Sequence, residues 1–132
     1  MSTKTTTHWQ KDQQFKSYHG NNEIKIDGKR ATGFGAKALL LSAIAACSGI
    51  DIVEILGKMR IEFSDFEIDT EAEQTDNNPR VFKDIFITYK LKTDKANEEK
   101  INKAIRLSLD RYCGVSAMMK KNSPIHYKLQ IL

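Results

Sequence analysis

Short alternating segments precede longer helical ones along this chain of 132 residues. Residues 3–10 and 13–18 carry aromatic side chains between polar neighbours, and Ile24 and Ile26 alternate with polar residues after a turn-rich stretch at 19–22. Alternation with a period of two residues is typical of strands. The amino-terminal part is therefore predicted to form three short strands in a meander.

The segment from Ala36 to about Arg60 has helical spacing, and its first half is nearly all apolar. Glycines 28, 33 and 35 break the chain before it begins. A helix that is apolar on most sides has to be covered on most sides. We therefore predict a central helix that is buried by the rest of the protein.

Residues 61–93 return to a period of two. Their apolar residues continue on one face after a one-residue slip at Ser64 and Asp65, which is typical of a β-bulge or a bend. The turn sequence Asp76-Asn77-Asn78-Pro79 divides the segment. A long β-hairpin is predicted here.

The last part of the chain reads as helix, short helix and strand. Residues 97–113 have helical spacing, with Asn97 placed to cap the start, and a short helical turn is expected at 115–119. Ser123-Pro124 then opens a strand whose apolar side chains alternate to residue 131. The chain has no internal repeat and no long linker, so we predict one domain over residues 1–132 and an α+β fold rather than a doubly wound sheet.

Composition narrows the class of protein. A hydrophobic content of 40% and a charged content of 29% are ordinary for a folded soluble chain. The net charge of +4 is modest and its basic residues are scattered, which argues against nucleic acid as a partner. The amino terminus lacks the pattern of a secretory signal, and the apolar stretch 38–47 is shorter than a membrane span. The prediction is a cytoplasmic protein that does not enter a membrane.

Metal and phosphate sites have no pattern in this sequence. His8, His19 and His126 are far apart and make no pair with ligand spacing. The segment 33–35 is too short for a glycine-rich phosphate loop. No metal and no cofactor are expected.

Cys47 and Cys113 are the only cysteines, and each lies in a segment predicted to be helical. Two thiols can store two electrons as a disulfide, and in a reducing compartment such a pair is more often catalytic than structural. Two inert buried cysteines are the plain alternative. Asp51 and Glu54 fall within about 40° of Cys47 around the helix, where carboxylates either disfavour a thiolate or are simply solvated.

Both cysteine segments resemble those of a known family. The run 39–47 followed by Gly-Ile-Asp-Ile-Val at 49–53, and Tyr-Cys-Gly-Val-Ser at 112–116 followed by Ser-Pro-Ile at 123–125, are similar to the central helix and the second cysteine segment of the OsmC/Ohr proteins. These are osmotically induced and organic-hydroperoxide-resistance proteins. The order of elements also matches over nearly the whole chain, with the hairpin between cysteines 66 residues apart.

The resemblance implies an intertwined homodimer and a thiol peroxidase. Cys47 would attack the hydroperoxide and become a sulfenic acid, and Cys113 would resolve it to a disulfide. The reductant implied is a dithiol, either a lipoylated protein or a small thiol.

The family also implies a cation that activates the first thiol. Arg30, the only arginine before the central helix, is the candidate, with Lys16 as a second one. The family's orienting glutamate is missing, since Lys37 and Ala38 occupy that region. Two functions therefore stay open: a peroxidase, or a non-peroxidatic dimer that binds a small apolar ligand or senses oxidants.

Overall fold

A three-stranded antiparallel sheet forms most of the amino-terminal unit in the computed structural model, which describes residues 1–132. The chain divides into two units, Met1–Leu40 and Leu41–Leu132, and each is described by itself. The strands of the first unit are β1 (Thr6–Lys11), β2 (Gln14–His19) and β3 (Asn22–Asp27), paired in the order β1-β2-β3. The predicted meander is confirmed, with the first strand beginning at Thr6 rather than at residue 3.

The loop after β3 is organised by the carboxylate of Asp27, which is only 2% exposed. It accepts hydrogen bonds from the amides of Lys29 (2.9 Å), Thr32 (3.1 Å) and Ala31 (3.3 Å) and from the Thr32 hydroxyl (2.9 Å). The bond from the Lys29 amide, followed by those from Thr32 and Ala31, holds the pKa of Asp27 below its usual range. Four donors on one carboxylate give this loop a defined conformation.

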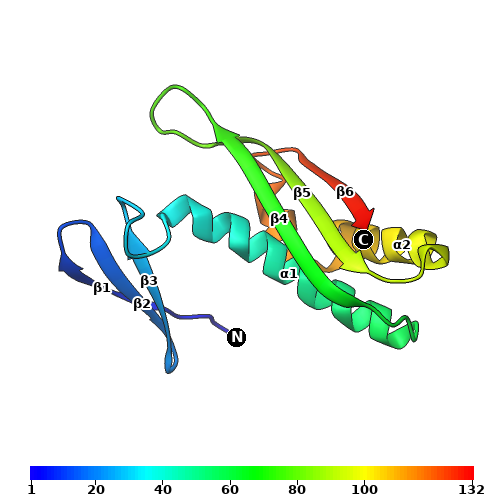
Figure 1. Ribbon diagram of the computed structural model, residues 1–132. Coiled ribbons are helices and arrows are strands. Elements are labelled where there is room, and N and C mark those ends of the chain that lie inside the picture. Colours follow the sequence, from blue (N-terminus) through cyan, green and yellow to red (C-terminus); the bar gives the residue numbers. More distant parts are fainter. The chain divides into compact units, whose positions relative to one another are not determined.

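The second unit is built on a mixed sheet, with strands in the order β4-β5-β6 (Figure 1). Strands β4 (Ser64–Gln74) and β5 (Phe82–Lys92) form the predicted hairpin, and β6 (Ile125–Ile131) pairs with β5 in parallel. The register of the hairpin shifts between Ser64 and Glu67, where Asp65 has a positive φ of 51°. The slip predicted a β-bulge or a bend, and the strands show a register shift at this place.

Helices cover one face of this sheet. The helix α1 spans Ala36–Lys58, and α2 spans Glu98–Leu107 (Figure 1). Apolar side chains from both helices and from β5 form one buried cluster, whose members include Ile44, Ile52, Leu56, Ile85, Ile87, Tyr89, Leu91, Ile101 and Ile105. Alternate residues of β5 point away from the helices, as a period of two requires.

The central helix is covered less completely than its sequence predicts. Ile50 and Val53 are 67% and 47% exposed, so α1 keeps an apolar stripe that the residues of its own unit do not cover. A stripe of this kind is typical of a contact surface.

The predicted helix 97–113 is divided between α2 and a π-helical turn, and a 3₁₀ turn leads into it. A 3₁₀ turn η1 (Lys95–Asn97) leads into α2, and a π-helical turn η2 (Ser108–Tyr112) follows it. The expected cap by Asn97 is wrong, because the helical path starts earlier and Asp94 caps it by accepting from the amide of Ala96 at 2.9 Å. Cys113 then has an extended backbone, with φ −76° and ψ 103°, and opens the short helix α3 (Gly114–Met119).

By length and composition α1 qualifies as a membrane-crossing helix, with a mean hydropathy of 2.0 over 18 residues. The apolar stretch exceeds the one counted from the sequence because isolated Ser and Gly residues lower the mean only slightly. Core helices of soluble proteins pass the same test. Here 28% of that window is buried, with Ile44, Ile52 and Leu56 packed against the second sheet.

Candidate functional site

The thiols of Cys47 and Cys113 lie side by side in the second unit, 66 residues apart in sequence. Cys113 is buried, at 2% exposure, whereas Cys47 on α1 is partly exposed. Burial, and next a hydrogen bond with the Cys47 thiol, raise the pKa of Cys113 to about 11. The buried thiol therefore holds its proton at neutral pH, and the more accessible thiol is its neighbour.

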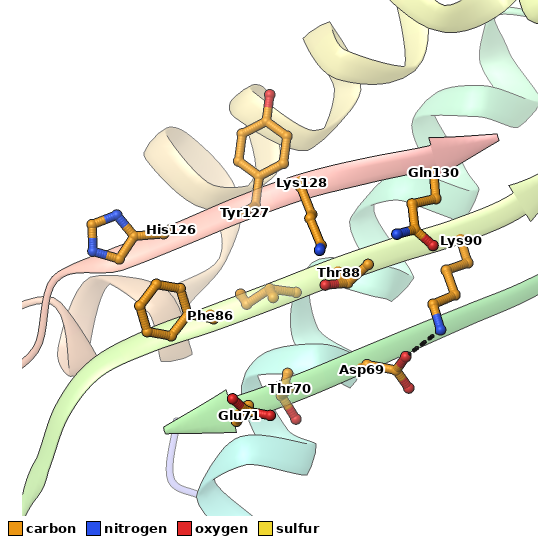
Figure 2. Close-up of a pocket in the computed structure, with 11 residues that line it drawn as sticks. Asp69, Thr70, Glu71, Phe86, Thr88, Lys90, His126, Tyr127, Lys128 and Gln130 are labelled. Atoms are coloured by element: carbon orange, nitrogen blue, oxygen red, sulfur yellow. Dashed lines mark ion pairs between the residues drawn. The ribbon is translucent and has the colours of Figure 1, made fainter. Parts of the chain in front are cut away.

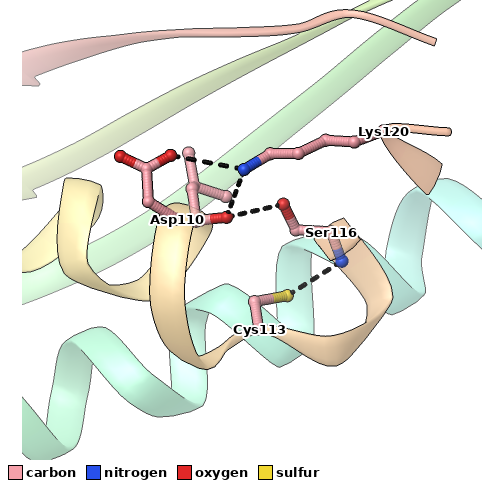
Figure 3. A network of polar contacts seen from close by, with 5 residues as sticks. Asp110, Cys113, Ser116 and Lys120 are labelled. Atoms are coloured by element: carbon pink, nitrogen blue, oxygen red, sulfur yellow. Dashed lines mark hydrogen bonds and ion pairs between the residues drawn. The ribbon is translucent and has the colours of Figure 1, made fainter. Parts of the chain in front are cut away.

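The backbone on either side of Cys113 fixes where its sulfur points. The Cys113 amide donates to the carbonyl of Ser108 at 2.7 Å, which closes the π-helical turn. Its Sγ accepts from the amide of Ser116 at 3.3 Å, at the start of α3 (Figure 3). The Ser116 amide favours the thiolate, but burial outweighs it.

A second set of polar contacts anchors α3 to the π-helical turn. The carbonyl of Leu109 accepts from the Ser116 hydroxyl at 3.0 Å and from the Lys120 ammonium at 2.7 Å (Figure 3). Lys120 also pairs with the carboxylate of Asp110 at 3.3 Å. The segment that carries Cys113 is thus tied at both of its ends.

Ser48, directly after Cys47, connects the turn of α1 that carries this thiol to the second sheet. Its buried hydroxyl donates to the carbonyl of Ile44 at 2.9 Å and accepts from the hydroxyl of Tyr89 on β5 at 2.8 Å. Burial raises the pKa of Tyr89 far above its usual value, so the phenol keeps its proton and remains a donor. The turn of α1 that holds Cys47 is therefore fixed against β5.

Asp51 links α1 to the π-helical turn. Its Oδ2 accepts from the Ser108 hydroxyl at 2.8 Å, and the charge of Asp51 also raises the pKa of Cys113. Glu54 is exposed instead and pairs with Lys58 at 3.6 Å. Of the two carboxylates on the Cys47 side of the helix, Asp51 is thus the one connected to the thiol pair.

Arg30 lies in the amino-terminal unit, in the loop that Asp27 organises. It has a left-handed backbone, with φ 58°, and its amide donates to the Asp27 carbonyl at 2.9 Å. A Cβ built on Gly35 would lie 3.3 Å from Arg30 Cγ, so Gly35 leaves room for the arginine stem. The position of Arg30 is defined within its own unit, and its activating role stays a prediction.

A hollow of about 540 Å³ continues along α1 beyond Asp51. Its lining is of mixed charge and comes from α1, the last residue of α2 and the end of the π-helical turn: Asp51, Glu54, Ile55, Lys58, Leu107 and Tyr112. Because Asp51 belongs both to this hollow and to the contacts of Cys113, the hollow adjoins the thiol pair. Its lining combines charged side chains with apolar ones.

A separate groove of about 590 Å³ lies on the face of the second sheet that points away from the helices (Figure 2). Phe86 stacks there on His126 with ring centroids 5.1 Å apart, and Lys90 pairs with Asp69 at 2.7 Å. Neither cysteine lines this groove. It is therefore distinct from the thiol site.

A known family matches most of this architecture. The sequence model of the OsmC-like protein family matches residues 27–128. This range includes both cysteines, all elements from α1 to α3, and most of β6. The chain belongs to the OsmC-like family. The recognition drawn from the two cysteine segments and the predicted α+β fold are confirmed.

Individual relatives agree with this membership. Protein YhfA of Escherichia coli K12 is 29% identical over 116 residues, covering 84% of each chain. A hypothetical protein from Aquifex aeolicus has a similar structure, with a TM-score of 0.85, 25% identity, and coverage of 100% of this chain and 98% of that one. The organic hydroperoxide resistance protein OhrB of Bacillus subtilis shares the fold at a TM-score of 0.66 and 20% identity, with 98% of each chain covered.

Three serines of this OsmC-like site were not singled out from the sequence: Ser48, Ser108 and Ser116. All three are buried. Ser48 and Ser108 make hydrogen bonds near the thiol pair, to Tyr89 and Asp51, and the amide of Ser116 donates to Cys113 Sγ. The available signal was a small polar residue on the apolar face of a helix within five residues of a cysteine. No group of three His, Cys, Asp or Glu side chains is arranged to hold a metal ion.

Proposed function

We propose that this OsmC-like protein is a thiol peroxidase that reduces organic or small hydroperoxides through Cys47 and Cys113. The observation that carries the proposal is the pairing of a partly exposed thiol with a buried one inside one unit. This is the arrangement that a two-cysteine reduction needs, because the first sulfur has to meet the peroxide and the second has to meet the first. The name of the OhrB protein, which shares the fold, supports the same substrate class.

The proposed reaction has two steps. The Cys47 thiolate attacks one oxygen of the hydroperoxide, an S–O bond forms, the O–O bond breaks, and the alkoxide leaves and takes a proton to become the alcohol. The sulfur of Cys113, once deprotonated, then attacks the sulfenic acid, an S–S bond forms, and hydroxide leaves and is protonated to water. A dithiol returns the disulfide to two thiols by exchange and is itself oxidised to a disulfide.

The surroundings of the thiols divide these roles. The raised pKa of Cys113 keeps this thiol protonated at neutral pH, so it does not compete as the first nucleophile. Cys47 lies well inside α1, about three turns from its amino terminus, so the helix dipole gives it little help. A cation has to supply that help, and we assign this role to Arg30.

We further propose an intertwined homodimer of a single domain over residues 1–132, working in the cytoplasm. The exposed apolar stripe of α1 supports the dimer, because Ile50 and Val53 line an apolar hollow of about 470 Å³ with Phe66 and Ile68. Apolar surface of this kind is stabilised by a second copy of the same surface. The reductant is a lipoylated protein or a small thiol.

A second candidate is a non-peroxidatic dimer that senses oxidants or binds a small apolar ligand. The observation that favours it is the carboxylate of Asp51 beside the thiol pair, because a negative charge there opposes thiolate formation. In that case the thiols react with peroxide only slowly. The two candidates differ in rate rather than in products.

The decisive experiment is stopped-flow consumption of cumene hydroperoxide by the pre-reduced protein, with Cys47→Ser as its control. A peroxidase consumes one equivalent rapidly, and its intact mass falls by two hydrogens as the disulfide forms. Cys113→Ser should consume the peroxide but gain oxygen on Cys47 instead. Equal, slow reaction of the wild type and Cys47→Ser would reject the peroxidase in favour of the second candidate.

The role of Arg30 is tested in the same assay. Arg30→Gln should slow the reaction of Cys47 about tenfold or more, because it removes the activating charge. Lys29→Gln is a matched control, since it removes one positive charge from the neighbouring position of the same loop. Equal rates for the two variants would remove Arg30 from the mechanism.

A further inference from the structure

The two segments that carry the thiols are joined by a polar contact besides the sulfurs themselves. Asp51 on α1 lies one helical turn after Cys47, and Ser108 begins the π-helical turn that ends at Cys113. The Ser108 hydroxyl, fully buried, donates to Asp51 Oδ2 at 2.8 Å and lies 3.4 Å from the Ser48 carbonyl. Here a side chain of α1 holds the start of the other thiol's turn.

The same serine also holds Cys113 through its backbone. The carbonyl of Ser108 accepts from the Cys113 amide at 2.7 Å. A path of two hydrogen bonds therefore runs from the helix of Cys47, through Asp51 and Ser108, to the backbone of Cys113. Both bonds are short. The bond from Ser108 to Asp51 has a carboxylate as its acceptor, and hydrogen bonds of that kind are among the stronger ones.

We propose that Asp51 and Ser108 are positioning residues of the thiol pair, whose hydrogen bond holds the turn ending in Cys113 against α1 so that a Cys47–Cys113 disulfide can close. This inference deepens the proposed function and rests on it only for its biological purpose. It requires that the two thiols form a disulfide, by whatever oxidant.

The need for positioning follows from the geometry of disulfides. A disulfide has an S–S length near 2.05 Å and tolerates a narrow range of separations between the two Cα atoms. The Cys113 turn is π-helical, a form that is rare and occurs mostly as single turns inside longer helices. Besides the contacts from α3, the hydrogen bond to Asp51 holds the start of this turn from the side of α1.

Asp51 is also a charge beside Cys113, and this gives a second measurable effect. The titratable groups that face the Cys113 thiol are Cys47 and Asp51 from α1 and Tyr89 from β5. Removing the Asp51 charge should lower the pKa of Cys113, since its negative charge contributes to the raised value. An amide in its place keeps an oxygen that accepts from Ser108.

The test measures the effective concentration of the two thiols in glutathione buffers. In that equilibrium the protein disulfide and two glutathiones give the protein dithiol and one oxidised glutathione, so no peroxide is needed. Asp51→Ala should lower the effective concentration about tenfold, the loss expected from one hydrogen bond to a charged group. The effective concentration in Asp51→Asn should stay within about twofold of the wild type. In this variant the thiolate absorbance at 240 nm should show Cys113 ionising at a lower pH.

Glu54→Ala is the matched control, because it removes a carboxylate from the same side of α1 whose partner is the exposed Lys58. Equal effective concentrations for Asp51→Ala and Glu54→Ala would overturn the proposal, and so would an equal loss in Asp51→Asn and Asp51→Ala. Ser108→Ala should match Asp51→Ala. Slow consumption of cumene hydroperoxide by the wild type would reject the peroxidase and leave the glutathione result intact.

Discussion

Replacing Ser48 by alanine tests how firmly the turn of α1 that holds Cys47 is tied to the second sheet. The Ser48 hydroxyl is buried, and it accepts the hydrogen bond of Tyr89 at 2.8 Å while donating to Ile44. In Ser48→Ala the Tyr89 hydroxyl is left buried without this acceptor. Leaving a buried donor unsatisfied costs about 1–3 kcal/mol of folding free energy.

Tyr89→Phe removes the same hydrogen bond from its other end at a lower cost. The hydroxyl of Ser48 still donates to the Ile44 carbonyl, so no donor is stranded. The expected loss is about 1 kcal/mol, the net value of a typical hydrogen bond. Because alanine favours helices by a few tenths of a kcal/mol over serine, Ser48→Ala should destabilise by about 1.5–2 kcal/mol.

The assay is urea unfolding of the reduced protein, with Ser42→Ala as control, since Ser42 is exposed on the same helix. Ser42→Ala should leave the stability unchanged or slightly raised. The double variant should lose about 1 kcal/mol less than the sum of the two single ones, because Tyr89 is no longer stranded when its hydroxyl is absent. An additive double variant, or a Ser48→Ala no worse than Tyr89→Phe, would refute the reasoning.

Further predictions concern pH and backbone. Because the folded state raises the pKa of Cys113 from 9.0 to about 11, reduced wild type should lose stability as the pH rises through that range, and Cys113→Ala should lose less in urea unfolding at pH 8 and pH 10.5. The pKa of Asp27 is lowered in the folded protein, so the stabilisation by this carboxylate is present at neutral pH and is lost as the pH falls below 3.8. Asp27→Ala should therefore cut the hydrogen-exchange protection of the loop amides about tenfold at pH 7. Unchanged protection would contradict the role of Asp27 in this loop. Gly57→Ala should stabilise α1 by about 0.5–1 kcal/mol, since a Cβ at this position meets nothing within 4 Å. Gly33→Ala should destabilise the fold, because its Cβ would lie 2.5 Å from the Lys25 carbonyl oxygen. The melting temperatures of the two variants should therefore shift in opposite directions.

The hairpin and the central helix could be predicted from the sequence because the patterns that indicate them lie within short segments of the chain. A period of two residues predicted the hairpin of β4 and β5, and the slip at Ser64 and Asp65 predicted the register shift that the strands show. The long apolar run predicted α1, and the two cysteine segments predicted the OsmC-like family. In each case the informative residues are neighbours along the chain, so no packing had to be known.

Local signals failed where two conformations compete within one segment. Residues 97–113 have uniform helical spacing, yet they form an α-helix and then a π-helical turn, and a 3₁₀ turn leads into them at Lys95–Asn97. The apolar pattern cannot separate these turns, since all three present similar faces over such short lengths. The cap moved from Asn97 to Asp94 for the same reason, because the first turn is 3₁₀ and begins earlier.

By itself the sequence determined the order of the main strands and helices and named the two thiols, because periodicity and family motifs depend on adjacent residues. Only the tertiary structure decided what surrounds those thiols. Ser108 reaches Asp51 across 57 positions, and Tyr89 reaches Ser48 across 41. Such bonds depend on how α1, β5 and the π-helical turn pack together, and a buried serine has the same letter in the sequence as an exposed one.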